Sequence, residues 1–231
     1  MTGRHALIIG ASRGIGLGLV ERLLERGWHV TATSRRTGDN GLSDLADRFD
    51  GRLHAEQVDI NIDDQVTALH QRLTGSAFDL ILVNAGVTHD RWETIAEVST
   101  ETFQRLMLTN ALSPMRFVER FADLAATTGT LALTSSGQGS IANNTRVTGW
   151  EVYRASKSAL NQLMRSYAAR HPDSPHTLLL LAPGWVRTEL GGSDATLTVE
   201  QSTTGLADVI ETQAGERGLA FLDYAGKTIP W

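Results

Sequence analysis

Short apolar runs alternate with longer amphipathic segments along the whole chain. Several of the runs are almost continuously apolar, as expected of parallel strands that are covered on both faces of a sheet. They predict strands at His5–Ile9, His29–Thr33, Leu53–Val58, Leu80–Val83, Thr130–Thr134, Thr177–Leu181 and Gly218–Leu222. The amphipathic segments predict helices at Ile15–Arg26, Leu42–Phe49, Asp63–Leu73, Thr100–Ala125, Val152–Arg170 and Val199–Gln213.

This alternation predicts an α/β fold: a single doubly wound Rossmann-like domain, with a seven-stranded, mainly parallel sheet and helices on both faces. No composition break, proline-rich linker or internal repeat divides the chain, so we expect one domain over residues 1–231. The segments 137–149 and 191–198 are polar and rich in small residues, and we expect them to be loops. Ligands of open α/β sheets bind among the loops beyond the carboxyl ends of the strands.

Composition narrows the class of protein. Of the 231 residues, 41% are hydrophobic and 20% are charged, a balance typical of a globular protein rather than a disordered one. The formal net charge of -5 argues against a nucleic-acid partner, which requires a basic surface. The chain has no cysteine, which excludes disulfides and thiolate metal ligands and fits a cytoplasmic location, and we expect no metal site. Its apolar runs are far shorter than the roughly 20 residues of a membrane helix, so we expect no membrane partner.

The first predicted strand leads directly into a glycine-rich turn that opens a helix. Its sequence is Gly10-Ala11-Ser12-Arg13-Gly14-Ile15-Gly16. Glycines allow a sharp backbone turn and the close approach of a pyrophosphate to the helix N-terminus, where unpaired N–H groups favour an anion. The turn therefore indicates a dinucleotide site, although the spacing differs from the Gly-x-Gly-x-x-Gly fingerprint and such turns are also found in purely structural roles.

The end of the second predicted strand indicates which dinucleotide is bound. An acidic residue at this position would bind the ribose 2′-hydroxyl of NAD, whereas arginine accommodates the 2′-phosphate of NADP. The strand ends in Ser34-Arg35-Arg36, and Arg13 of the glycine turn could reach the same phosphate. Forked guanidinium groups suit phosphate, so we expect NADP(H) to be the cofactor. The alternative is that these arginines are solvated loop charges.

Tyr153 and Lys157 are four residues apart and share one face of a predicted helix. A nearby ammonium group favours the phenolate, so we expect Lys157 to lower the pKa of Tyr153 from its free value of about 10. Tyr153 would then act as an acid or base near neutral pH. Taken alone, such a pair is usually an ordinary surface feature.

Together these motifs resemble those of the short-chain dehydrogenase/reductase family, in order and spacing, over essentially the whole chain. The glycine turn is similar to that family's cofactor motif, and Asn84-Ala85-Gly86 is similar to its Asn-Ala-Gly motif. Tyr153 and Lys157 match its Tyr-x-x-x-Lys motif. Pro183-Gly184-Trp185-Val186-Arg187-Thr188 matches its Pro-Gly segment, which contacts the nicotinamide in relatives. The resemblance implies a cofactor-binding half at about residues 1–125 and a catalytic and substrate-binding half at about 126–231.

The resemblance also implies roles for single residues. Tyr153 would protonate a carbonyl oxygen, and Lys157 would lower the pKa of Tyr153 and hold the nicotinamide ribose. Asn110 matches the family asparagine that anchors a water molecule beside the lysine. The cofactor would also contact Asp59 and Ile60 at its adenine, and Pro183, Gly184, Val186 and Thr188 at its nicotinamide.

The catalytic serine has two candidates. Ser136 ends the fifth predicted strand, where the family has its serine, but Ser140 has the commoner separation from Tyr153. Strand context defines backbone position better than a count of residues through a loop. We therefore expect Ser136 to complete a tetrad with Asn110, Tyr153 and Lys157.

The finer resemblance is to the carbonyl-reductase-like branch that includes the sniffer and C-factor proteins. Its marks here are Gly139-Ser140-Ile141, Tyr153-Arg154 and the segment Pro183–Val186. It implies an enzyme that reduces an aldehyde or ketone with NADPH. The alternative is an NADP-binding signalling or regulatory protein of C-factor type. The intact Tyr153, Lys157 and Asn110 argue against a pure binder.

The substrate itself is not indicated by any motif. The candidate pocket residues are Gln138, Trp150 and Trp185, and an aromatic pocket would suit a hydrophobic small-molecule carbonyl or alcohol. We also expect a homodimer or homotetramer. The two long helices at Thr100–Ala125 and Val152–Arg170 carry more apolar side chains than a sheet-facing stripe requires. These side chains are Phe103, Met107, Phe117, Phe121, Leu160, Leu163 and Met164.

Overall fold

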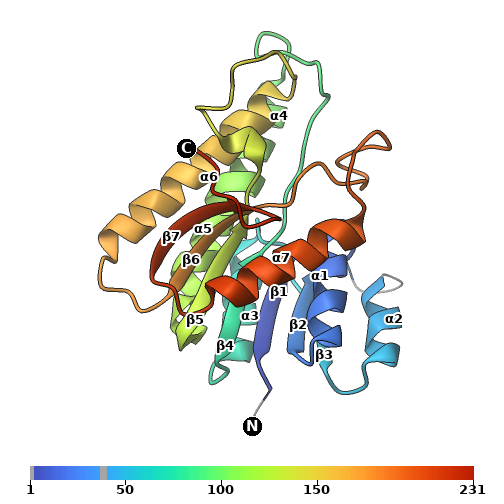
Figure 1. The fold of residues 1–231 in the computed structure, drawn as a ribbon, viewed down its shortest axis with the longest axis vertical. Coiled ribbons are helices and arrows are strands. Elements are labelled where there is room, and N and C mark those ends of the chain that lie inside the picture. Colours follow the sequence, from blue (N-terminus) through green and yellow to red (C-terminus); the bar gives the residue numbers. More distant parts are fainter. Residues whose placement is uncertain (1–2, 37–40) are drawn as a thin grey trace.

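The computed structural model describes residues 3–36 and 41–231 and contains one seven-stranded sheet. All six strand pairs are parallel, and the strand order is β3-β2-β1-β4-β5-β6-β7 (Figure 1). The strands are β1 (His5–Ile9), β2 (His29–Ser34), β3 (Leu53–Gln57), β4 (Phe78–Val83), β5 (Ala125–Thr134), β6 (Thr177–Ala182) and β7 (Gly218–Asp223). The predicted Rossmann-like α/β fold is confirmed.

Six helices cover the two faces of the sheet. They are α1 (Gly14–Glu25), α2 (Gly41–Arg48), α3 (Asp63–Leu73), α5 (Ser113–Phe121), α6 (Glu151–Arg170) and α7 (Val199–Gln213). Five of them match predicted helices closely, and α5 matches part of one. Helices α1, α2 and α7 pack on one face, whereas α3, α5 and α6 pack on the other. In Figure 1, α1 and α7 cross in front of the strands.

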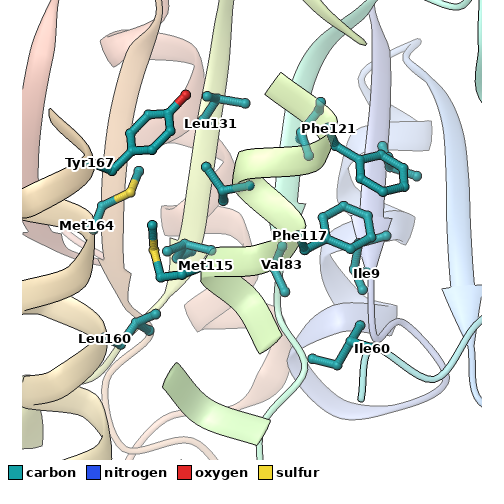
Figure 2. Packing of buried hydrophobic residues seen from close by; sticks show 14 of the residues in the cluster. Ile9, Ile60, Val83, Met115, Phe117, Phe121, Leu131, Leu160, Met164 and Tyr167 are labelled. Carbon is teal, nitrogen blue, oxygen red and sulfur yellow. The ribbon is translucent and has the colours of Figure 1, made fainter. Parts of the chain in front are cut away.

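Alternate residues of each strand supply the two cores. In β1, Leu7 and Ile9 join the core beneath α3, α5 and α6, while Ala6 and Ile8 join the core beneath α1, α2 and α7. This is the period-two alternation of a sheet that is covered on both faces. Figure 2 shows the first core, where Phe117 and Phe121 of α5 stack with ring centroids 3.8 Å apart. No helix in residues 3–36 and 41–231 is both long and apolar enough to cross a membrane.

The predicted helix Thr100–Ala125 is not continuous, and this prediction was wrong. It consists of α4 (Thr100–Met107), the wide π-helical turn η1 (Leu108–Leu112), α5 and the 3-10 turn η2 (Ala122–Leu124). Strand β5 then begins at Ala125, five residues before the predicted start. Pro114 at the start of α5 has no N–H to donate to the carbonyl of Asn110, four residues earlier, so a regular α-helix cannot continue there. The N–H of Ser113 instead donates to the carbonyl of Leu108, five residues earlier.

Candidate active site

A cavity of about 860 Å³ lies at the carboxyl ends of the strands. Loops that follow β1, β2, β3, β4, β5 and β6 line it, as expected for an open α/β sheet. The predicted site residues that line it are Gly10, Ser12, Arg13, Gly14, Ile15, Ser34, Arg35, Asp59, Ile60, Asn84, Ala85, Gly86, Ser136, Gln138, Trp150, Tyr153, Lys157, Pro183, Gly184, Trp185, Val186 and Thr188. Gly16, Arg36 and Asn110 do not line it.

The glycine turn has the geometry that only glycine accommodates well. Gly10 and Gly14 have φ values of 85° and 56°, in the left-handed region. A Cβ atom on Gly16 would lie 2.2 Å from the carbonyl oxygen of Gly10, so Gly16 allows α1 to pack against the turn. Asn84 braces the turn, because its Nδ2 donates to the carbonyl of Gly10 and its Oδ1 accepts from Thr134.

The start of α1 fits a pyrophosphate. Its N-cap residue, Arg13, makes no side-chain capping hydrogen bond, and its first turn contains no acidic side chain. The first N–H groups of a helix lack intrahelical acceptors and attract anions. The uncapped N–H groups can donate to a pyrophosphate, and the glycine turn beside them has no room for larger side chains. Both features fit the dinucleotide that the sequence predicts.

The described part of the β2 end, up to Arg36, presents arginine side chains and no carboxylate. Arg35 lines the cavity, whereas Arg36 does not, and the backbone carbonyl of Arg36 accepts from the Ser34 hydroxyl. Arg13 is ion-paired with Glu189, and both side chains are largely exposed. At the neighbouring corner, Asp59 accepts from the backbone N–H of Asn61. Of the three predicted arginines, Arg35 and Arg13 line the cavity, and Arg13 is engaged by Glu189.

Tyr153 and Lys157 lie on one face at the start of α6, as predicted, but the expected direction of the Tyr153 pKa was wrong. Burial raises the pKa of Tyr153, and a hydrogen bond with Ser136 offsets only part of this effect. Burial also lowers the pKa of Lys157 to about 8. The Lys157 Nζ donates to the carbonyl of Thr134 at 2.8 Å and lies 5.9 Å from the centre of the Tyr153 ring. Because desolvation disfavours the charged form of both groups, a protonated phenol is the stable state here.

The two candidate serines have different surroundings. The Ser136 hydroxyl bonds to Tyr153 and also caps the 3-10 turn η3 (Gly137–Gly139) by accepting from the N–H of Gln138. The Ser140 hydroxyl instead donates to the carbonyl of Pro230 at 2.5 Å and accepts from the N–H of Asn143. Ser140 therefore ties its loop to the end of the chain, and only Ser136 is placed beside the phenol.

Asn110 is fully buried inside the π-helical turn. Its side-chain amide makes two hydrogen bonds with the backbone of Val87, donating to the carbonyl and accepting from the N–H, both at 2.8 Å. It also donates to the Ser156 hydroxyl. The wide turn thus aims Asn110 at the segment after β4 and at α6, next to Lys157. A π-turn at a functional site is a common arrangement.

Comparison with known proteins agrees with this geometry. The sequence profile of the short chain dehydrogenase family matches residues 4–196. The chain belongs to this family. It is similar to a short-chain dehydrogenase/reductase from Burkholderia multivorans whose structure contains bound NADP, with 49% identity, a TM-score of 0.97, and coverage of 99% of this chain and 100% of the other.

Two further relatives locate the chain within the short-chain dehydrogenases. A carbonyl reductase from Pseudomonas aeruginosa PAO1, in complex with NADP, is 40% identical with a TM-score of 0.92, and both chains are fully covered. The C-signal protein of Myxococcus xanthus is 36% identical over 156 residues, which cover 66% of this chain and 92% of the relative. The resemblance to the carbonyl-reductase-like branch is confirmed.

The end of the cavity that the sequence predicts to bind the substrate (the substrate end) contains the three predicted residues and one arginine that the sequence did not reveal. Gln138, Trp150 and Trp185 all line the cavity, and Trp185 donates from its indole to the carbonyl of Gly191 at 2.8 Å. Arg91, in the loop after β4, lines the cavity beside Trp150. No periodic pattern or motif distinguishes Arg91, because the segment around Trp150 that packs against it is more than fifty residues away in the sequence.

Most of the apolar side chains that suggested an oligomer belong to the core of the subunit. Phe117, Phe121, Leu160 and Met164 are buried, which removes them from any interface. Phe103 and Leu163 are each 39% exposed, on α4 and α6, which contact each other. The apolar excess on these helices was therefore overestimated, and the oligomer stays a prediction that rests on Phe103 and Leu163.

Proposed function

We propose that this short-chain dehydrogenase is an NADPH-dependent reductase that converts a small aldehyde or ketone to an alcohol. The observation that carries the proposal is the cluster of half-buried Ser136 and Tyr153 with buried Lys157, all three of which line one cavity with the glycine turn. The NADP-bound relative and the NADP-bound carbonyl reductase support the same cofactor and substrate class. The absence of a carboxylate near Arg35 in the described part of the β2 end supports NADPH over NADH.

In the proposed mechanism, the carbonyl oxygen accepts hydrogen bonds from Ser136 and Tyr153. Tyr153 donates its proton to that oxygen, and its raised pKa keeps the proton in place at neutral pH until the transition state requires it. Bound NADPH supplies the hydride. Lys157 sits behind the phenol and, while charged, stabilises the phenolate that forms. Asn110 positions the Val87 segment and Ser156 around Lys157.

We further propose that residues 1–231 act as one domain in the cytoplasm, as a homodimer or homotetramer. The cofactor half, at about 1–125, and the catalytic half, at about 126–231, line the same cavity, which supports their acting together. No cluster of three metal-ligating side chains occurs in the part of the chain that the structure describes, and the mechanism requires no metal.

The rival function is an NADP-binding regulatory protein without turnover, and the similarity to the C-signal protein favours considering it. A panel of aldehydes, quinones, diketones and ketosteroids, assayed with NADPH and NADH, separates the two. We expect NADPH oxidation with at least one carbonyl and a lower rate with NADH. NADPH binding without turnover on every compound would support the regulatory function instead.

A further inference from the structure

The loop after β4 brings Arg91 to the substrate end of the cavity, where two tryptophan rings and a backbone carbonyl contact its guanidinium group. Its guanidinium carbon lies 4.7 Å from the centre of the Trp92 ring and 4.4 Å from that of Trp150. Its Nε donates to the carbonyl of Thr148 at 3.3 Å. Both aromatic distances are within the range of cation–π attraction, so the guanidinium is held in a defined plane.

The chain is strained where it holds Arg91. Trp150 has φ 56° and is the only residue other than glycine with a positive φ in the described ranges 3–36 and 41–231. Its N–H donates to the carbonyl of Arg91 at 2.6 Å. Gly149 precedes it at φ 79°, and a Cβ atom there would lie 2.3 Å from the same carbonyl. Strain of this kind is retained when the surrounding structure requires it, and it is concentrated at functional sites.

A second arginine, Arg154, is joined to the first through Thr148 and lies behind the residues that line the cavity. Arg154 of α6 follows Tyr153 directly, and its Nη1 donates to the hydroxyl of Thr148 and to Oε1 of Gln138. The Nε of Arg154 is buried with no hydrogen-bond partner in the structure. Oε1 of Gln138 accepts from Arg154, and the NH2 of Gln138 is a donor that it can offer to a ligand.

No carboxylate in residues 3–36 and 41–231 forms an ion pair with either guanidinium. The ion pairs among the described residues include neither Arg91 nor Arg154. The nearby carboxylates face elsewhere, since Asp90 accepts from the N–H of Trp92 and Glu151 accepts from the N–H of Ile95. Partly buried arginines usually have an acidic partner. Because these two do not have one among the described residues, this end of the cavity has an excess of positive charge and of hydrogen-bond donors.

Building on the proposed reductase function, we propose that the physiological substrate is a carbonyl compound with an anionic group, a carboxylate or a phosphate, which Arg91 binds. Trp150 caps α6 three residues before Tyr153. Arg91 thus stacks on a residue that precedes Tyr153 by about one helical turn of the backbone, and both Arg91 and Tyr153 line the cavity. A substrate that reaches from Tyr153 to this arginine places its carbonyl at Tyr153 and its anion against the Arg91 guanidinium, beside Trp150. Arg154 and the NH2 of Gln138 add positive charge and a donor at the same end.

The first test compares two aldehydes that differ at one para substituent, a charged carboxylate in 4-carboxybenzaldehyde and a neutral ester in methyl 4-formylbenzoate. The wild-type protein should reduce the carboxylate with a kcat/KM about 10- to 100-fold higher, the worth of one charge-assisted hydrogen bond. Arg91→Met should abolish this preference by raising KM for the carboxylate, and should leave the ester nearly unchanged. Arg91→Lys should retain part of the preference, because it retains the charge and loses the planar stacking.

Arg105→Met is the matched control. Arg105 also supports the loop after β4, by donating to the carbonyl of Thr88, but it is exposed and does not line the cavity. This variant should keep the full preference for the carboxylate. Equal losses with acid and ester in Arg91→Met would show that Arg91 only holds the loop. A wild-type protein with no preference would overturn the proposal as well.

A binding measurement separates this proposal from the reductase proposal. Calorimetry of the NADPH-loaded protein with 4-(hydroxymethyl)benzoate involves a reduced cofactor and an alcohol, which cannot react with each other. If the acid binds at least about tenfold more tightly than its methyl ester, and Arg91→Met removes this difference, the anion site is supported even if no carbonyl is turned over. Equal binding of acid and ester contradicts the anion site even if reduction is fast.

Discussion

The two ends of the cavity are built in different ways. The cofactor end is mostly backbone: glycines at positive φ, uncapped N–H groups of α1, and an amide that braces the turn. The substrate end is mostly side chains, delivered by the loop after β4, the loop before α6 and the segment after β6. One end is a surface shaped for a phosphate chain, and the other is a set of charged and aromatic groups held by tertiary contacts.

This difference determines what substitutions at each end should do. At the cofactor end a change of side chain should alter which dinucleotide binds, while the backbone cradle keeps its shape. At the substrate end a change of side chain should alter the chemical step or the choice of carbonyl compound and leave NADPH binding intact.

Tyr153→Phe should have the largest effect. It removes only a hydroxyl, so folding and NADPH affinity should be unchanged while kcat for carbonyl reduction falls by about 10²- to 10⁴-fold, the usual worth of a general acid. Steady-state kinetics beside NADPH titration by fluorescence measures both. Near-normal reduction in this variant would remove Tyr153 from the chemistry.

Ser136→Ala should lower kcat by about 10²- to 10³-fold, because it removes a hydrogen-bond donor to the developing oxyanion. NADPH affinity should again be preserved. Ser140→Ala is the matched control, since Ser140 bonds to Pro230 and Asn143 instead of Tyr153, and it should lower thermal stability more than kcat. A larger loss of kcat in Ser140→Ala would reverse the assignment.

Arg35→Asp tests the cofactor end. It replaces a phosphate partner with a repulsive carboxylate, so KM for NADPH should rise by about 10- to 100-fold while KM for NADH changes little. Comparable changes with both cofactors would mean that Arg35 does not face the 2′-phosphate. Kinetics with a single carbonyl substrate and both cofactors gives the answer.

The smallest effect is the dependence of reduction on pH. Lys157 has a pKa lowered to about 8, so its ammonium loses its proton as the pH rises through that value. The pKa of Tyr153 is raised, so the phenol keeps its proton over the same interval. Reduction should therefore decline by about tenfold between pH 7 and pH 9. In Lys157→Arg, which is expected to be slow, this decline should vanish, because guanidinium stays charged. An unchanged decline would assign it to another group.

The sequence predicted the cofactor end more completely than the substrate end, for a physical reason. The glycine turn and the arginines after β2 are contiguous stretches whose geometry follows from local backbone preferences, and Gly10, Gly14 and Arg35 line the cavity as expected. Most predicted strands and helices also lie within one or two residues of the observed ones, because apolar periodicity reports burial directly.

The errors occurred where tertiary contacts override local pattern. The apolar pattern through residues 100–125 indicated one helix, although Pro114 was a visible sign of the interruption at Asn110. The pKa of Tyr153 was expected to fall because a helix places Lys157 nearby, yet the dominant cause is burial, which depends on the whole fold. Arg91 was missed because its partners come from a distant loop.

The most direct test of the central claim follows the hydrogen atom itself. The protein is mixed with a stoichiometric amount of NADPH deuterated at the transferable C4 position and with a carbonyl compound that it consumes. Mass spectrometry and NMR of the alcohol should then locate one deuterium on the carbinol carbon, and Tyr153→Phe should form almost no labelled alcohol in the same time. Bound NADPH that keeps its deuterium in the presence of every carbonyl compound tested would contradict the reductase assignment.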